Sequence, residues 1–337
     1  MAAAAGSADV RVYLLTYRRN HLLPRALDSL IAQTHTNWIC ELHNDDPDDP
    51  FPETLVAAAN DRRITYHRHA RNLGPTASFN NVFKPIHEPF ISLLEDDNWW
   101  EPQLLERLFA AIAPHPSINV AWSNCHLWRE TGQHEWRREG TIWPVDGHGA
   151  ITIFETPHPM QACRAIHSNG AMILRVTNET TVPTPLSAPF VAVERMRERA
   201  YPGRLLMVRE PLANFAITLE SSRRETADES MQLMVLLAMT LMKRCPDTRE
   251  FFGRMWAECR GARGHLLRPL VVAGAMAGRL RRVLMSASPG DLAVVAAWAM
   301  LNPRRFAGLF KAPARFPEVL EFLEAAGARA AALSGKS

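Results

Sequence analysis

The stretch EDDNWWEP, residues 95–102, decides how this chain is expected to fold. It directly follows the apolar run FISLL of residues 90–94, which predicts a buried strand. Pro102 then introduces an amphipathic helix with apolar residues at helical spacing through residue 112. Acidic side chains at the carboxyl end of a buried strand lie where open α/β sheets bind their ligands. This placement favours a hard divalent cation held against a phosphate, and so a nucleotide-dependent transferase.

The same acids have an alternative explanation, because acidic residues ahead of a helix can cap its first amides and complement its dipole. On local grounds the two explanations are equally good. Two further polar segments favour the ligand site: residues 15–19 (LTYRR) follow the first predicted strand, and residues 44–46 (NDD) follow the second. Three polar ends on successive strands are hard to explain by capping, because parallel strands end at one edge of a sheet.

The order of patterns predicts an α/β protein with a mainly parallel sheet wound with helices. Predicted strands and helices alternate up to about residue 208, and only helical patterns follow from about residue 224. We therefore expect a frayed N-terminus at residues 1–9, an α/β domain at 10–222 and a helical extension at 223–337. The predicted strands are residues 10–15, 38–43, 64–67, 90–94, 118–123, 171–175 and 205–208, and the predicted helices include 20–31, capped by Asn20, and 53–59.

The composition is typical of a globular cytoplasmic protein. Of the 337 residues, 47% are hydrophobic and 22% are charged. The five cysteines form no C-x-x-C pair, so we expect reduced thiols that lie mostly in the core. The longest apolar runs, residues 233–242, 269–278 and 292–301, are shorter than the roughly 20 residues that a membrane span needs. They predict buried or interfacial helices.

The charge is unevenly distributed. Residues 243–315 hold 14 Lys or Arg against 4 Asp or Glu, while the whole chain carries only +3. Such a stretch could contact an anionic membrane peripherally at its inner face, or join two copies into a homodimer through the C-terminal helices. The solvated side of ordinary helices is the simpler explanation. Nucleic acid is disfavoured as a partner, because the basic residues lack interleaved stacking aromatics.

The motifs together resemble a family 2 inverting glycosyltransferase of the GT-A fold. The similarity covers roughly residues 10–218. It rests on VYLLTYRR at 12–19 with LDSLIAQT at 27–34, on NDD at 44–46, on Asn72, Gly74 and Asn80, and on residues 93–105, which resemble the Asp-x-Asp segment of that family.

This resemblance implies roles for particular residues. Asp97, with Glu95 as the second candidate, would hold Mn²⁺ or Mg²⁺. Trp99 or Trp100 would form a platform for the sugar or the acceptor, while at least one of the two is expected to pack under the sheet. The implied donor-binding residues are Thr16, Tyr17, Arg18, Asp45, Asn72, Gly74, Asn80 and Asp96.

The chain departs from the family where the general base is expected. The usual Glu-Asp pair at the start of a helix falls on Phe190 and Val191 in an ungapped alignment. We therefore expect Glu194, one helical turn later, to be the base, with His167 as the second candidate. The His that often binds metal in the family corresponds to Thr218.

The implied function is transfer of a sugar from a UDP-sugar, or as second choice a dTDP-sugar, to a hydroxyl on a glycan, a lipid-linked sugar or a small molecule. The alternative is a degenerate member that binds nucleotide-sugar without transferring it. A nucleotidyltransferase would need a glycine-rich loop after the first strand, and residues 15–20 contain no glycine. One more motif, His67-x-His69, could indicate metal, but without a third ligand a hydrogen-bonded pair is the better interpretation.

Overall fold

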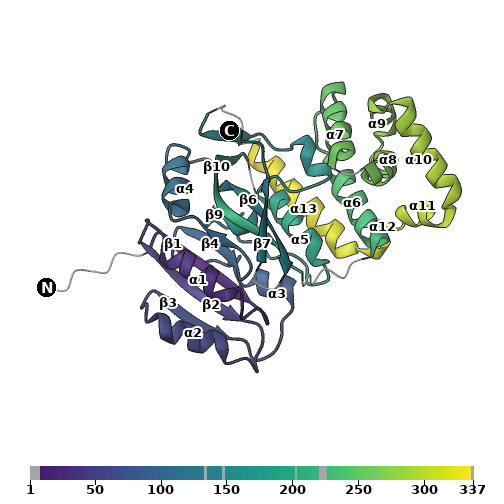
Figure 1. The fold of residues 1–337 in the computed structure, drawn as a ribbon. Helices are drawn as coiled ribbons and strands as arrows, with labels where there is room; N and C mark the ends of the chain where they lie inside the picture. The colour runs from purple at the N-terminus through teal and green to yellow at the C-terminus, as the bar shows by residue number, and fades with distance from the viewer. Residues whose placement is uncertain are drawn as a thin grey trace. The chain divides into compact units, whose positions relative to one another are not determined.

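The computed structural model describes residues 8–132, 135–145, 149–201, 203–219, 226–262 and 264–334. The chain divides into two compact units (Figure 1). Unit 1 comprises Met1–Phe154, His167–Pro183 and Gly203–Ser222, and unit 2 comprises Glu155–Ile166, Thr184–Pro202 and Arg223–Ser337. Two segments that precede residue 222 therefore pack with the C-terminal helices. The predicted boundary at residues 221–224 lies outside the described residues and stays a prediction.

Unit 1 is built on a ten-stranded sheet. Its strands are β1 (Val10–Thr16), β2 (Trp38–Asn44), β3 (Ile64–Arg68), β4 (Phe90–Glu95), β5 (Trp99–Trp100), β6 (Val120–Gly132), β7 (Glu135–Thr141), β8 (Ile151–Phe154), β9 (Met172–Arg175) and β10 (Leu205–Ile217). They run in the order β3-β2-β1-β4-β9-β6-β10-β5, while β7 pairs with β6 and β8 pairs with β10. Strands β1 to β4 are mutually parallel, as are β6 and β10.

The α/β prediction is confirmed, but the sheet is mixed, because β5, β7, β8 and β9 pair antiparallel to their neighbours. The predicted strands at 118–123 and 205–208 continue for 13 residues each as β6 and β10. The apolar run marks only the buried first part of β6, whose second part is half-buried and polar. A search for apolar runs therefore misses the second part of such a strand.

Three helices cover one face of this sheet. Leucines of α1 (Leu23–Ile31) and α4 (Leu104–Ile112) join the apolar side chains of β1 and β2 in a single core, and α2 (Phe51–Ala59) packs at its margin. Asn20 does not cap α1: the residue that precedes the helix is Leu22, and its side chain makes no capping hydrogen bond. Helix α4 is likewise preceded by Gln103, so the acids of residues 95–97 do not cap it.

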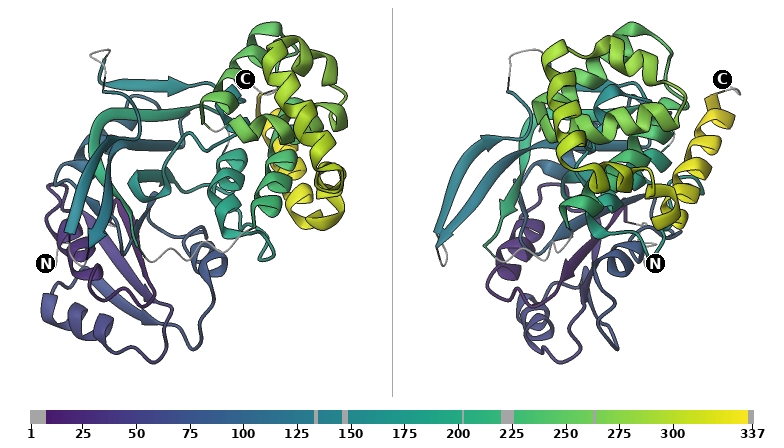
Figure 2. Two further views of the ribbon diagram at one scale, coloured as in Figure 1. Left: turned by 45° about the vertical axis from the view of Figure 1, so that its right-hand side comes forward. Right: turned by 90° about the vertical axis from the view of Figure 1, so that its right-hand side faces the viewer.

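The regular elements of unit 2 in the described residues are all helices, and this confirms the prediction for the C-terminal part. Figure 2 shows its green and yellow helices packed against one another. None of the described helices combines the length and the apolar character that a membrane span requires. The helices are α5 (Phe190–Ala200), α6 (Ala227–Met242), α7 (Arg249–Ala262), α8 (Leu267–Met276), α9 (Leu280–Ser286), α10 (Pro289–Leu301), α11 (Pro303–Leu309), α12 (Ala312–Arg315) and α13 (Pro317–Ser334), with short 3-10 turns at Pro159–Ala162 and Gly264–Leu266.

The five cysteines are buried and form no disulfide, as predicted: Cys40, Cys125, Cys163, Cys245 and Cys259.

Candidate active site

The three polar strand ends predicted from the sequence lie at one edge of the sheet. In the parallel register, Thr16 of β1 pairs with Asn44 of β2, and Leu15 pairs with Glu95 of β4. The residues that follow these positions therefore leave the sheet side by side. The polar segments 16–19, 44–46 and 95–97 are neighbours because three strands end together.

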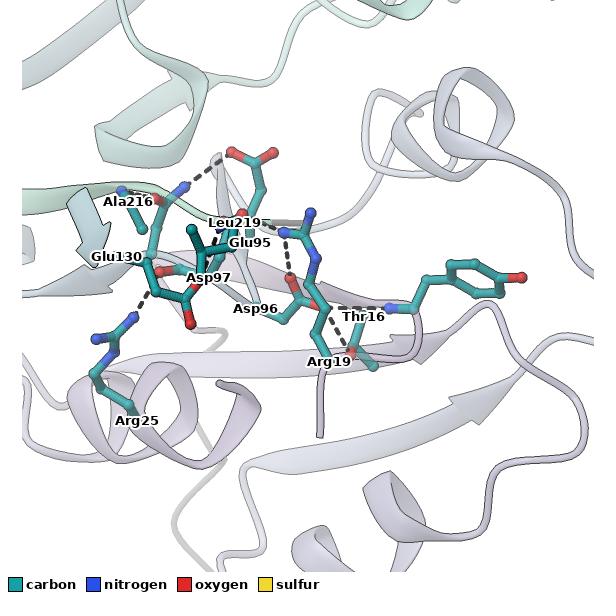
Figure 3. A network of polar contacts seen from close by, with 11 residues as sticks. Thr16, Arg19, Arg25, Glu95, Asp96, Asp97, Glu130, Ala216 and Leu219 are labelled. Carbon is teal, nitrogen blue, oxygen red and sulfur yellow. Dashed lines mark hydrogen bonds and ion pairs between the residues drawn. The ribbon is translucent and has the colours of Figure 1, made fainter. Parts of the chain in front are cut away.

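Asp96 links the end of β4 to the end of β1. Its Oδ2 accepts a hydrogen bond from the Thr16 hydroxyl at 2.9 Å and another from the Tyr17 backbone N–H at 3.2 Å (Figure 3). The residue is only 5% exposed. Burial, followed by repulsion from Asp97, raises the pKa of Asp96 to about 7.

Asp97 is held by two arginines of the first unit. The Arg19 guanidinium contacts the Asp97 carboxylate and lies 3.5 Å from Oδ1 of Asp96. Arg25 donates to the Asp97 backbone carbonyl at 2.9 Å (Figure 3). Burial raises the pKa of the Asp97 carboxyl, and the Arg19 charge opposes that rise. The buried carboxylate of Asp96 and the half-buried one of Asp97 thus share one guanidinium.

Glu95 completes the acidic stretch. Its Oε2 accepts from the Asn98 amide at 3.1 Å, and the Asn98 Oδ1 accepts from the Ala216 backbone N–H at 2.9 Å. Asn98 therefore ties the acidic stretch to β10. Carboxylate oxygens are the donors that Mg²⁺ and Mn²⁺ prefer. Burial disfavours the charged form of both aspartates. A second positive charge beside Arg19 would stabilise the two carboxylates, so these residues fit a divalent cation.

Asp45 organises the end of β2. Its Oδ1 accepts from the Leu73 backbone N–H at 2.8 Å and lies 2.9 Å from Nδ1 of His69. Its Oδ2 accepts from the Gly74 N–H at 3.0 Å, and the Asn72 side chain accepts from the same N–H at 2.7 Å. The Gly74 N–H thus joins Asp45 and Asn72, and the donor-binding roles of these three residues stay predictions.

The remaining predicted donor-binding residues are Tyr17, Arg18 and Asn80. Tyr17 is 40% exposed, and Arg18 packs over its ring while donating to Asp46 Oδ2 at 2.6 Å. Asn80 is the last residue of α3 (Pro75–Asn80), the helix that follows Gly74. These positions leave the predicted donor roles open.

Of the two tryptophans, only Trp99 remains a candidate platform. Trp100 is 3% exposed, belongs to the core, and donates from Nε1 to the Gly170 carbonyl at 2.7 Å, so a platform role for it is wrong. Trp99 lies 5.6 Å from Trp128 between ring centroids, and the Arg25 guanidinium lies 3.7 Å from the Trp99 centroid. The expectation that one tryptophan packs under the sheet is confirmed.

The two candidate bases lie in different units. His167, in unit 1, is buried; its Nε2 is 3.0 Å from Asn169 Oδ1, and its ring packs edge-on against Trp122. Glu194 is half-buried on α5 of unit 2, the helix that begins at Phe190. Both assignments stay predictions.

Sequence reasoning missed three site residues. Arg19 was visible only as part of a polar strand end, and nothing in the spacing showed that it reaches two aspartates. Arg25 lies on the first helix and gave no signal. Asn98 directly follows the acidic residues 95–97 and gave no signal of its own.

Comparison with known proteins finds similar glycosyltransferases. Residues 12–165 match the family model described as Glycosyl transferase family 2. Residues 12–165 are therefore similar to a family 2 glycosyltransferase domain. Among curated relatives, UDP-Glc:alpha-D-GlcNAc-diphosphoundecaprenol beta-1,3-glucosyltransferase WfgD of Escherichia coli is 21% identical over 55% of this chain and 66% of its own length. The E. coli K12 glycosyl transferase WcaA, named for colanic acid biosynthesis, is 29% identical over 30% of this chain and 37% of its own length. The chain thus spans between about a third and two thirds of these relatives.

Solved structures show that the family 2 glycosyltransferase domain has the GT-A fold. S. aureus TarS in complex with UDP-GlcNAc superposes with a TM-score of 0.57 at 12% identity, over 95% of this chain and 92% of that chain. The complex of the same protein with UDP gives a TM-score of 0.52 at 11% identity, over 82% and 90% of the two chains.

Proposed function

We propose that this protein is a metal-dependent inverting glycosyltransferase that moves a sugar from a UDP-sugar to an acceptor hydroxyl. One observation carries the proposal: Asp96 is hydrogen-bonded to Thr16 and Tyr17, so the acids of β4 lie directly beside the polar end of β1. Asp45 leaves the sheet at the same edge, since its N–H donates to the Thr16 carbonyl at 3.0 Å. The residues that we expect to bind the nucleoside and those that we expect to bind the diphosphate can therefore contact a single ligand.

Each group has a distinct part in this proposal. Asp45, Thr16 and Tyr17 bind the nucleoside, and Asp97 with Glu95 holds Mn²⁺ or Mg²⁺. A cation bound there neutralises the charge that develops on the departing nucleoside diphosphate. Arg19 supplies a second positive charge at the same place and limits repulsion between the two aspartates. Trp99, fixed by Arg25, offers an aromatic face to the sugar.

The choice of uridine rests on similarity. TarS was solved with UDP and with UDP-GlcNAc, and the name of WfgD specifies UDP-Glc. A dTDP-sugar is the second choice, because thymine and uracil present the same hydrogen-bonding edge. The acceptor class is open among glycans, lipid-linked sugars and small molecules.

The direct experiment measures Mn²⁺-dependent release of UDP from a panel of UDP-sugars, with and without acceptors. Asp97→Ala is expected to lower the rate about 10²-fold or more, since removing one preorganised electrostatic group at a developing charge has an effect of that size. Asp48→Ala is the matched control, because Asp48 is exposed in the loop after β2. Equal rates for Asp97→Ala and wild type would contradict the proposal. Release of pyrophosphate from a nucleoside triphosphate would indicate a nucleotidyltransferase instead.

The base is tested separately. Glu194→Gln is expected to lower kcat by roughly 10²- to 10⁴-fold with little change in KM for the donor, as removal of a general base does. Glu321→Gln, an exposed substitution on α13, is the control. If Glu194→Gln retains full activity and His167→Gln does not, His167 is the base.

A degenerate, non-catalytic protein is the second candidate, and the absence of the Glu-Asp pair at Phe190 and Val191 favours it. It predicts Mn²⁺-dependent binding of UDP by the wild type without turnover of any donor in the panel. Turnover of a single donor, even a slow one, would eliminate this candidate.

A further inference from the structure

A cluster of two histidines and a glutamate lies in unit 1, outside the acidic stretch of β4. Glu41 and His43 are two residues apart on β2, so their side chains share one face of the sheet. His67 of β3 stands opposite His43 in the parallel register. One potential ligand atom from each of these three residues lies within 4.8 Å of the other two.

The hydrogen bonds around this cluster need a cation. Nε2 of His43 is 3.0 Å from Oε2 of Glu41, and Nδ1 of His43 is 3.0 Å from Nε2 of His69. Nδ1 of His69 is in turn 2.9 Å from Oδ1 of Asp45. These three contacts need three protons, whereas two neutral imidazoles carry only two, so one imidazole holds an extra proton or a metal ion replaces that proton. With a metal ion on Nε2 of His43, Nδ1 of His43 donates to Nε2 of His69, and Nδ1 of His69 donates to Asp45.

The acidic and basic side chains beside the cluster are equal in number. Arg11 contacts Glu41 and also donates to both carboxylate oxygens of Glu88, at 2.9 and 3.0 Å. Lys84 also faces the cluster. Two acids thus balance two basic groups.

We propose that Glu41, His43 and His67 form a binding site for a divalent transition metal such as Zn²⁺. Two imidazoles and one carboxylate are a ligand set that zinc commonly uses, with a water in the fourth position. His67 is half-buried on the edge strand β3, which gives solvent access to that position. Of the His67-x-His69 pair only His67 is a ligand, and the neighbouring strand β2 supplies the other two.

The outer contacts match those of a metal-bound histidine. A histidine that binds metal through one nitrogen usually donates its other N–H to a fixed acceptor, which orients the ring. Here His43 donates to His69, and His69 donates to Asp45. The proposed site is separate from the cation site of residues 95–97 and does not depend on the transferase reaction.

Direct titration tests the site. The full-length protein is stripped with a chelator, dialysed and titrated with Zn²⁺ by calorimetry without nucleotide. Wild type is expected to show a site that His67→Gln and Glu41→Gln each weaken at least about 10²-fold. His115→Gln, a histidine after α4, and Asp97→Asn are the controls and are expected to leave this site unchanged. The visible absorption of bound Co²⁺ provides a second readout, because its bands depend on which side chains coordinate the metal.

Absence of Zn²⁺ binding by the wild type, or equal affinity in wild type, His67→Gln and Glu41→Gln, would overturn the proposal. In either case the gap between Glu41 and His43 holds a proton. Thermal unfolding of each metal-free variant confirms that it folds. His67→Gln keeps the test decisive if Glu41→Gln does not fold, because it changes only a half-buried side chain on an edge strand.

Discussion

Asp96 makes the stability of this protein depend on pH. Its carboxyl group is buried beside Asp97, and its pKa is raised to about 7 from an ordinary value of 3.8. Below about pH 4 the group is protonated in both the folded and the unfolded chain, so its titration contributes nothing. Between about pH 4 and 7 the unfolded chain loses this proton more readily, so the contribution of Asp96 to folding stability falls as the pH rises.

Asp96→Asn is therefore expected to remove part of this pH dependence. Without divalent ions, the Tm of the variant minus that of the wild type should increase from pH 4.5 to pH 7.5. The full effect of a three-unit shift is about 4 kcal/mol, and the hydrogen bonds lost with the carboxylate reduce it. Differential scanning fluorimetry across that range measures the trend. A Tm difference that stays constant would show that Asp96 titrates as an exposed carboxyl group does.

At this scale the sequence identified the acids but not the groups that hold them. Residues 95–97 were recognisable from the strand before them. Their pairing with Arg19 depends on where β1 and β4 end in space, and no local pattern encodes that. The platform role for Trp100 was wrong for a related reason, since neighbouring residues on a short strand face opposite sides and Trp100 faces the core.

The turn between β3 and α3 shows how one element shapes the site. Gly74 precedes α3 with φ of +79° and ψ of 161°, a conformation that is almost confined to glycine. In this conformation its N–H points at Asp45 Oδ2, 3.0 Å away. The backbone of the turn thus fixes the orientation of the carboxylate that we expect to contact the nucleoside.

Gly74→Ala is expected to strain this turn at a cost of about 1–3 kcal/mol and to weaken UDP binding, because Asp45 loses a fixed donor. Gly253→Ala is the matched control. Gly253 lies within α7, its conformation is not left-handed, and an added Cβ meets no atom within 4 Å. That change should leave UDP binding intact and stabilise the helix by up to about 1 kcal/mol. Denaturant unfolding and calorimetric UDP titration test both variants. Unchanged affinity for UDP in Gly74→Ala would show that Asp45 does not contribute to binding of the donor.

Elements with a strong local pattern were predicted closely, and elements defined by pairing were not. The predicted strands 10–15, 38–43 and 64–67 each extend by one residue in the structure. Strands β7 and β8 escaped prediction because β7 is mostly exposed and β8 has only four residues. β7 pairs with β6, which directly precedes it, whereas β8 pairs with β10, which lies much further along the chain.

On the scale of the whole molecule, the sequence separated an alternating region from a helical one. It could not show that Glu155–Ile166 and Thr184–Pro202 pack with the C-terminal helices, because this grouping depends on contacts between segments far apart in the chain. Helix α6 illustrates those contacts: residues 231–242 are buried all round, so neighbouring elements of unit 2 must surround it.

The last helices of unit 2 carry an apolar surface within the basic stretch of residues 243–315. On α10, Val294, Met300 and Leu301 are 61%, 75% and 81% exposed, and Arg304 follows them on α11. Exposed apolar groups beside arginines suit an anionic bilayer surface, where both the burial of apolar area and the charge contribute to binding. This surface is therefore where the predicted peripheral contact with anionic lipid can be tested.

The full-length protein is accordingly expected to sediment with anionic liposomes at low salt and to be released as the salt concentration rises, because salt screens the electrostatic part. Met300→Gln combined with Leu301→Gln should reduce the bound fraction. Val145→Gln, which removes an apolar side chain of unit 1 that is 64% exposed, should not. Protein that stays in the supernatant at low salt would reject lipid as the partner. If the double variant then also changes the oligomeric state in analytical ultracentrifugation, the apolar surface joins two copies of the chain instead.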